Sequence, residues 1–191
     1  MATSSSARLS MPSSRWQTPI EAYAHVRNVR YPTGALSDSV RSRHGVKRLV
    51  SAIGVIVAHV ASITQTAETA NLVEWAKLAL NSPQARVLRV TRVRYDAPYD
   101  PPVALEEVVL ALDRFPGLNP NGADVPDVVE LAQLHNLSLG RATERVSVIQ
   151  ATKAMALHLG IPMGSDVLRL ERIAETVDGE PVEWRVVFRK I

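Results

Sequence analysis

The sequence predicts an α+β fold, mostly antiparallel sheet with small helices, built from two related halves. The first observation is a repeat about 80 residues apart: Val87-Leu-Arg-Val-Thr-Arg-Val93 returns as Val167-Leu-Arg-Leu-Glu-Arg-Ile173. Only Thr91 and Glu171 differ in chemical kind between the two copies. The second observation is that the same order of local patterns surrounds each copy. The third is composition: 191 residues, 46% of them hydrophobic and 21% charged, are typical of a soluble domain with a sizeable core.

Each half is predicted to contain a strand, a short helix, a second strand, a turn and a third strand. In the first half, β-branched, Ala-rich and Pro-containing stretches place these elements at residues 49–60, 67–80, 87–93, 96–102 and 103–112. In the second half they are expected at residues 145–149, 152–159, 167–173, 178–181 and 182–189. The pair Asp178-Gly179 favours a tight hairpin turn.

One further helix is expected between the halves. Pro126 suits the first turn of a helix, and an apolar stripe continues to about Asn136. The elements together favour two copies of one small unit joined by a helical connection.

The charge distribution divides the chain into an arm and a body. Residues 1–50 hold eight basic and two acidic residues, whereas residues 51–191 hold fourteen basic and seventeen acidic residues. We therefore expect a basic, Ser-rich and partly disordered arm at 1–45 and a folded domain at 46–191. The formal net charge of +3 is too small for the whole chain to be a nucleic-acid binder, so an electrostatic partner is expected only at the arm.

Several classes of site lack their signature. The chain has no cysteine, which excludes disulfides, thiolate nucleophiles and Cys-based zinc sites and suits a reducing cytoplasm. Its five histidines show no metal-ligand spacing, and no nucleophile elbow, dinucleotide fingerprint or P-loop is present. The most apolar stretch, 49–63, is shorter than the roughly 20 residues of a membrane-spanning helix. We expect a cytoplasmic protein without metal, cofactor or membrane anchor.

Arginines recur on what the strand alternation predicts to be a core face. Arg92 and Arg94 share a face with leucine- and valine-type residues of the first repeat strand, and Arg172 does so in the second. Burying a guanidinium is costly unless an anion pairs with it. Two interpretations follow: the arginines lie at the sheet rim or pair with carboxylates such as Glu106 or Glu183, or they line a concave site and bind a carboxylate or phosphate ligand.

Five motifs between about 49 and 189 carry a resemblance to a known family. They are Arg86-Val-Leu-Arg-Val-Thr-Arg-Val-Arg94-Tyr, Pro102-Val-Ala-Leu-Glu-Glu107, Arg114-Phe-Pro-Gly-Leu118, His158-Leu-Gly-Ile-Pro-Met-Gly-Ser165 and Asp178-Gly-Glu-Pro-Val-Glu183. In order and spacing they resemble the UTRA domain, the ligand-binding half of HutC-type GntR transcription regulators, which has a chorismate-lyase-like fold.

The resemblance implies an effector pocket between the two halves for a small anionic or sugar-like metabolite. In phosphosugar-binding members, the residues at the positions of Arg92, Arg94, Glu106 and Glu183 face the ligand. The expected ligand-binding residues are these four together with Arg172 and Phe188, and no catalytic residue is expected. The family's dimerisation implies a homodimer.

This sequence differs from the family's pattern in three ways, which limit what the resemblance implies. No winged helix-turn-helix pattern is found in the roughly 45 residues before the domain, the middle helix reads Asp127-Val-Val-Glu130, and the family's late Tyr-Arg is Phe188-Arg189. We therefore expect a domain that senses a carboxylate- or phosphate-bearing metabolite and contacts DNA only through a partner chain. The alternatives are a chorismate-lyase-like enzyme using Arg92 and Glu183, or a modulator that dimerises with full-length regulators.

Overall fold

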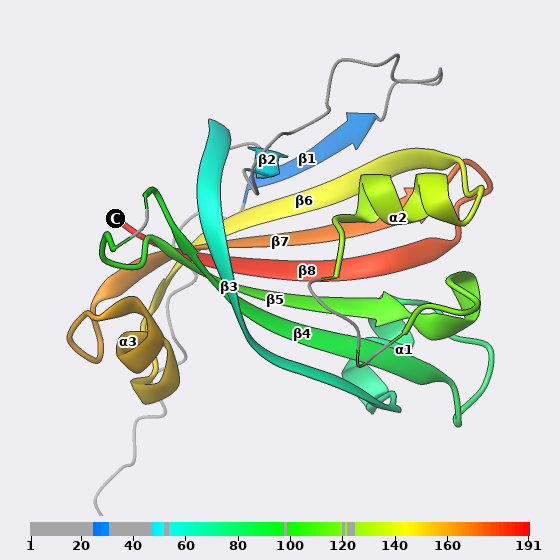
Figure 1. Cartoon of the computed structure of the whole chain (residues 1–191), viewed down its shortest axis with the longest axis horizontal. Coiled ribbons are helices and arrows are strands. Elements are labelled where there is room, and N and C mark those ends of the chain that lie inside the picture. The colour runs from blue at the N-terminus through cyan, green and yellow to red at the C-terminus, as the bar shows by residue number, and fades with distance from the viewer. Residues whose placement is uncertain (1–24, 31–46, 52–53, 98, 120, 122–124) are drawn as a thin grey trace, which may run out of the picture.

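The fold is an eight-stranded antiparallel sheet flanked by short helices (Figure 1). The structure, a computed structural model, describes residues 25–30, 47–51, 54–97, 99–119, 121 and 125–191. The strands are β1 (His25–Arg30), β2 (Lys47–Ser51), β3 (Gly54–Thr69), β4 (Arg86–Tyr95), β5 (Ala104–Ala111), β6 (Leu139–Gln150), β7 (Asp166–Thr176) and β8 (Pro181–Lys190). The helices are α1 (Leu72–Lys77), the 3-10 turn η1 (Leu112–Arg114), α2 (Val128–Leu134) and α3 (Lys153–Leu159). The predicted α+β class is confirmed.

The two repeats lie side by side in one sheet. The strand order is β1-β6-β7-β8-β5-β4-β3-β2, so β3-β4-β5 and β6-β7-β8 are related halves that meet where β5 pairs with β8. A duplication of this kind suggests two halves that pack face to face, but here they are joined edge to edge within one sheet. Antiparallel pairing of the third strand of each half satisfies two sheet edges that would otherwise be exposed.

Helices cover both faces of the sheet. Val128 and Leu131 of α2 pack on Leu88, Val90 and their neighbours in one hydrophobic cluster. The opposite face carries two further clusters. Leu78 and Leu80, which follow α1, pack on Val87, Val109 and Ala111. Leu159 of α3 packs on strand residues of the second cluster, which are Val93, Leu105, Val167, Val186 and Phe188. The sheet is therefore buried on both sides, and either face can hold a protected site.

Two element boundaries in the first half differ from those the sequence predicts. The run at 49–60 is not one strand, because β2 ends at Ser51 and β3 begins at Gly54, with these two residues opposite each other in an antiparallel pair. The expected helix at 67–80 begins only at Leu72, where Asn71 caps it and Glu74 completes a capping box. Residues 67–69 instead extend β3, because they continue the antiparallel pairing with β4 as far as Arg86.

The middle helix begins later than Pro126 suggested. Asp127 is its N-cap, and the Asp127 carboxylate accepts hydrogen bonds from the backbone N–H groups of Val129 and Glu130. A side-chain acceptor at the cap satisfies more orphan donors than a proline in the first turn could. The helix therefore spans Val128–Leu134.

The N-terminal arm lies mostly outside the described residues. Its described part, β1, pairs antiparallel with β6 along six register positions. The boundary between an arm at 1–45 and a domain at 46–191 stays a prediction. In the described part of the chain, no helix is long and apolar enough to cross a membrane.

Gly140 lies where the neighbouring backbone leaves no room for a side chain. A Cβ atom at Gly140 would lie 2.7 Å from the backbone oxygen of Thr176 and 2.8 Å from Cα of Val177. We expect Gly140→Ala to lower the free energy of unfolding by about 1–3 kcal/mol, because two backbones must move apart. Urea unfolding measures it, with Ser138→Ala, at an exposed position nearby, as the control. Equal midpoints for wild type and Gly140→Ala would contradict the expected close approach.

Candidate functional site

Seven charged side chains are buried together on the sheet face that α2 covers. Each is at most 8% exposed, and they are Arg92, Arg94, Arg172, Arg185, Glu106, Glu144 and Glu183. We call this set the charged cluster. Charged residues are rarely buried without partners, since each loses several kcal/mol of solvation. The charged cluster is therefore the feature of the fold that most needs an explanation.

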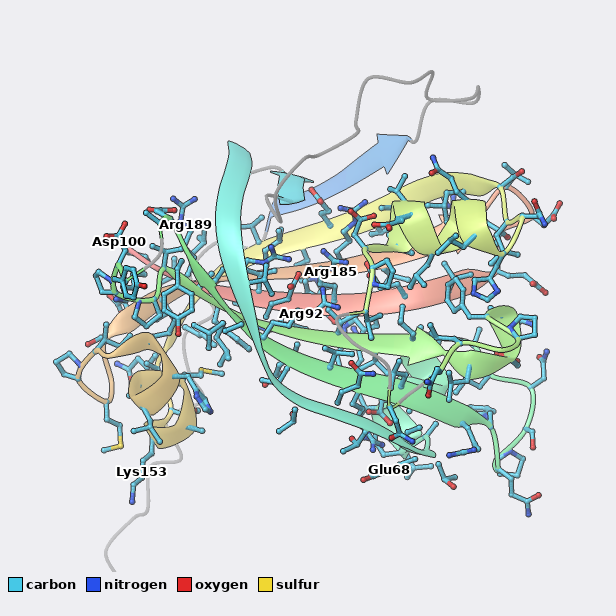
Figure 2. The ribbon with its side chains drawn as sticks, viewed as in Figure 1. Glu68, Arg92, Asp100, Lys153, Arg185 and Arg189 are labelled. Carbon is cyan, nitrogen blue, oxygen red and sulfur yellow. The ribbon has the colours of Figure 1, made fainter. Side chains whose placement is uncertain are left out.

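Strand register brings the charged cluster together. Arg92 lies directly opposite Glu106, and Arg172 lies opposite both Arg185 and Glu144 on its two neighbouring strands. Directly opposed residues share a face, and residues two apart on one strand share it too. Figure 2 shows Arg92 and Arg185 near each other over the middle of the sheet. Five strands, β4 and β5 of the first half and β6, β7 and β8 of the second, thus contribute to one site.

Glu106 lies between two guanidinium groups. Its Oε2 is 2.5 Å from Nη2 of Arg94, and its Oε1 is 3.0 Å from Nη1 of Arg185. Burial alone would raise the pKa of Glu106, but the charges of Arg185, Arg94 and Arg92 outweigh burial and lower that pKa below its ordinary value of 4.5. Glu106 is therefore ionised at neutral pH and holds two arginines in place.

Arg185 links the two carboxylates at the centre of the sheet. Its Nη2 donates to Oε2 of Glu183 at 2.6 Å, in addition to the contact with Glu106. Burial alone would lower the pKa of Arg185, whereas Glu183 and Glu106 raise it above its ordinary value. Arg185 therefore remains a cation and occupies one oxygen of each carboxylate.

The remaining members extend the charged cluster to both sides. Arg92 donates from Nη2 to the backbone carbonyl of Val125, in the segment that leads into α2. On the other side, Nη1 of Arg172 lies 3.9 Å from Oε1 of Glu144. Burial lowers the pKa of Arg172, Glu183 opposes this, and Arg185 adds to it. The segment before α2 thus contacts the site through Arg92.

The charged cluster has one more cation than anions. Four arginines face three glutamates, and among the described residues Nε and Nη1 of Arg94 and Nε of Arg185 are buried without a hydrogen-bond partner. Oε1 of Glu183 is likewise buried without a partner in the described part of the chain. Buried guanidinium donors of this kind match an anion that carries several acceptor oxygens. The positive charge of four guanidiniums also disfavours binding of a metal cation. The described residues contain no group of three or more His, Cys, Asp or Glu side chains that could hold one.

Five of the six residues expected at the ligand site lie in the charged cluster: Arg92, Arg94, Arg172, Glu106 and Glu183. The first of the two interpretations holds in part, because Arg94 does pair with Glu106, but neither Arg92 nor Arg94 lies at a rim. The structure does not bring Phe188 to this set. Phe188 lies between Val187 and Arg189, one residue out of phase with Glu183 and Arg185, so it packs on the opposite face beside Leu159 of α3.

Sequence reasoning missed Arg185 and Glu144. Arg185 lies two residues after Glu183, so the strand period already put the two on one face. For Glu144 there was no comparable signal, since its role depends on pairing with β7.

Three solved structures illustrate what the chain is similar to. A GntR-family transcriptional regulator from Enterococcus faecalis V583 is 20% identical, with a TM-score of 0.61, and the match covers 68% of this chain and 91% of that chain. The C-terminal domain of Yurk from Bacillus subtilis is 21% identical, with a TM-score of 0.60, covering 68% and 87%. The effector domain of PhnF from Mycobacterium smegmatis is 21% identical, with a TM-score of 0.62, covering 70% and 80%. At these identities the likeness shows a shared fold.

The family comparison goes further than the fold. The UTRA domain family matches residues 54–188, which is well over half of the chain and includes all seven members of the charged cluster. The chain therefore belongs to the UTRA domain family and shares its fold with domains of GntR-family transcription regulators.

Proposed function

We propose that this domain senses a small metabolite bearing a carboxylate or phosphate, and that the charged cluster binds it. Arg92, Arg94, Arg172, Glu106 and Glu183 are the proposed ligand-binding residues, with Arg185 added from the structure. The observation that carries the proposal is the pair of buried Arg94 nitrogens that have no hydrogen-bond partner among the described residues, within a cluster of four arginines.

The energetics favour an anion over an empty site. Leaving a buried polar group unsatisfied costs about 1–3 kcal/mol, and more when the group is charged. Arg94 alone has two such nitrogens, and Glu106 already uses the third. Folding has already removed these N–H groups from water. A carboxylate or phosphate that accepts hydrogen bonds from them therefore binds without a further cost for desolvating the donors.

Glu183 adds a second requirement. Its Oε2 accepts from Arg185, which leaves Oε1 to accept a hydrogen bond from the ligand. The effector that fits best therefore combines an anionic group with a hydroxyl or amine. Phe188 has no part in this proposal, because it lies on the other face.

The proposal includes the setting in which the domain acts. We infer a HutC-type, chorismate-lyase-like domain at 46–191 that works as a cytoplasmic homodimer and reaches DNA only through a partner chain. Two sheet edges, at β1 and β2, support association with a second copy, and the absence of cysteine suits the cytoplasm. Analytical ultracentrifugation tests the dimer.

A thermal-shift panel tests the anion. Phosphate, acetate, succinate and lactate are compared with acetamide and succinamide at constant ionic strength. A true anionic ligand at about a hundred times its dissociation constant stabilises the fold by about 2.7 kcal/mol, which raises Tm by roughly 5–10 °C. The neutral amides should not raise Tm. If amides and acids shift Tm equally, or if no anion of a wider panel shifts it, the proposed function is wrong.

A further inference from the structure

Four members of the charged cluster form a chain of alternating charge across three neighbouring strands. Nη2 of Arg94 on β4 donates to Oε2 of Glu106 on β5 at 2.5 Å. The other oxygen of Glu106 lies 3.0 Å from Nη1 of Arg185 on β8. Nη2 of Arg185 in turn donates to Oε2 of Glu183 at 2.6 Å. The chain therefore starts with a cation at Arg94, ends with an anion at Glu183, and has no net charge.

The two ends of this chain carry hydrogen-bonding atoms that are not used. At the cationic end, Nε and Nη1 of Arg94 have no partner among the described residues, and at the anionic end the same holds for Oε1 of Glu183. The two residues are 2% and 1% exposed, so bulk water does not reach these atoms and their unmade hydrogen bonds are costly. A ligand that satisfies both ends offers an acceptor to Arg94 and a donor to Glu183.

Asp127 adds a fourth carboxylate beside the charged cluster. It caps α2 two residues after Val125, whose carbonyl accepts a hydrogen bond from Arg92. The charge of Asp127 also raises the pKa of Arg185. With Asp127 counted, the four arginines are matched by four carboxylates. A ligand with a net negative charge would disturb this balance in a buried site, whereas a ligand that brings its own cation would keep it.

Arg172 is the cation that opposes a positive group at the Glu183 end. The charge of Glu183 acts to raise the pKa of Arg172, so the two side chains interact electrostatically. Glu144 lies 3.9 Å from Arg172 and offsets part of its charge. Oε1 of Glu183 is thus left as the acceptor for the ligand, and a charged donor makes a stronger hydrogen bond with a carboxylate than a neutral donor does.

We propose that the effector is a zwitterion, with a carboxylate that binds Arg94 and an ammonium group that binds Glu183. This inference rests on the proposed function of the charged cluster and narrows its ligand class to compounds that carry both groups. A hydroxyl analogue of the same length offers Glu183 a neutral donor but leaves a net negative charge in the site. It should therefore bind more weakly than the ammonium compound.

Matched pairs of compounds test this by titration calorimetry of wild type at pH 7 and constant ionic strength. In each pair a hydroxyl replaces the ammonium group: alanine and lactate, 4-aminobutyrate and 4-hydroxybutyrate, and 6-aminohexanoate and 6-hydroxyhexanoate. In the pair that binds most tightly, the Kd of the ammonium compound should be lower by about tenfold or more, because a hydrogen bond between two charged groups is stronger than one from a neutral donor.

Two substitutions test where the ammonium group binds. Glu183→Gln removes the charge of the acceptor and should bring the two Kd values of that pair to within about twofold of each other. Asp127→Asn keeps the helix cap, since asparagine caps as well as aspartate, and should lower the preference for the ammonium compound by about threefold or more. Asp166→Asn removes the same charge at an exposed position and should keep the wild-type preference. If Glu183→Gln does not fold, the comparison of Asp127→Asn with Asp166→Asn is the test.

Failure of this inference is distinguishable from failure of the proposed function. If the hydroxyl compounds bind as tightly as their ammonium partners, or if anions of the wider panel bind while no ammonium compound does, the zwitterion is wrong and the proposed function stands. A preference that is unchanged in folded Glu183→Gln and in Asp127→Asn overturns the placement of the ammonium group at Glu183. If wild type binds none of the paired compounds and no anion of the wider panel, both are overturned.

Discussion

Replacing Glu106 with glutamine should lower the free energy of unfolding by about 3–5 kcal/mol, although the side chain keeps its size. The carboxylate is 0% exposed and lies within 3.0 Å of both Arg94 and Arg185. Without its charge the fold must bury guanidiniums that no longer have their anion, and breaking a buried ion pair from one side typically costs this much. The same substitution on the surface would cost almost nothing.

Urea unfolding at pH 7 measures this effect, with Glu130→Gln on the exposed side of α2 as the control. The Glu130 variant should unfold at nearly the wild-type midpoint. Added phosphate or succinate should raise the midpoint of Glu106→Gln by more than it raises that of wild type, because the ligand replaces the missing anion. A Glu106→Gln protein as stable as wild type would mean that the charged cluster is solvated rather than buried.

Arg185→Met should destabilise the fold by about 3 kcal/mol and should do so in a pH-dependent way. Loss of Arg185 leaves Glu183 without its 2.6 Å partner and leaves Glu106 with Arg94 as its nearest cation. Methionine fills a similar volume, so the cost is electrostatic rather than a cavity.

The sign of the pH dependence follows from Glu106, whose pKa in the folded state is lower than its ordinary value of 4.5. A carboxylate with a lowered pKa contributes stability that is fully present above its ordinary pKa and is lost as the pH falls through the folded-state value. The difference in unfolding free energy between wild type and Arg185→Met should therefore be constant from pH 7 to about pH 5 and shrink below about pH 4.5. Urea unfolding at stepped pH measures it, with Arg145→Met, at an exposed position, as the control. A difference that stays constant to pH 3 would contradict the ion-pair account.

The sequence was sufficient to predict the second and third strands of each repeat. The Val-Leu-Arg motifs mark β4 and β7, and the strands expected at 103–112 and 182–189 agree with β5 and β8 to within two residues. Such segments carry a strong local pattern, which tertiary contacts only reinforce. The split into β2 and β3 was not predictable, because an unbroken apolar run reads as one strand and no strong turn signal interrupts it. Nor could the repeat reveal that the halves join through β5 and β8, since that depends on which edges pair.

The site was predictable as far as strand alternation extends. Arg92 and Arg94 were placed on one face by their spacing, and the structure agrees. Alternation could also have excluded Phe188, which is an odd number of residues from Glu183 on the same strand. The contact between Arg185 and Glu106 could not be predicted, because these residues meet only through the register of β5 with β8. The chemical class of the ligand and the boundary of the arm stay predictions.

Calorimetric titration of the strongest anion from the panel into wild type, Arg94→Gln and Arg145→Gln tests the central claim most directly. Arg94 presents two buried, unpartnered nitrogens among the described residues, whereas Arg145 is exposed and on the other face of the sheet. Charge-assisted hydrogen bonds contribute about 1.5–3 kcal/mol each, so Arg94→Gln should raise Kd at least tenfold while Arg145→Gln leaves it unchanged. Equal affinities for all three proteins, with Arg94→Gln folded, would contradict the assignment of the charged cluster as the effector site.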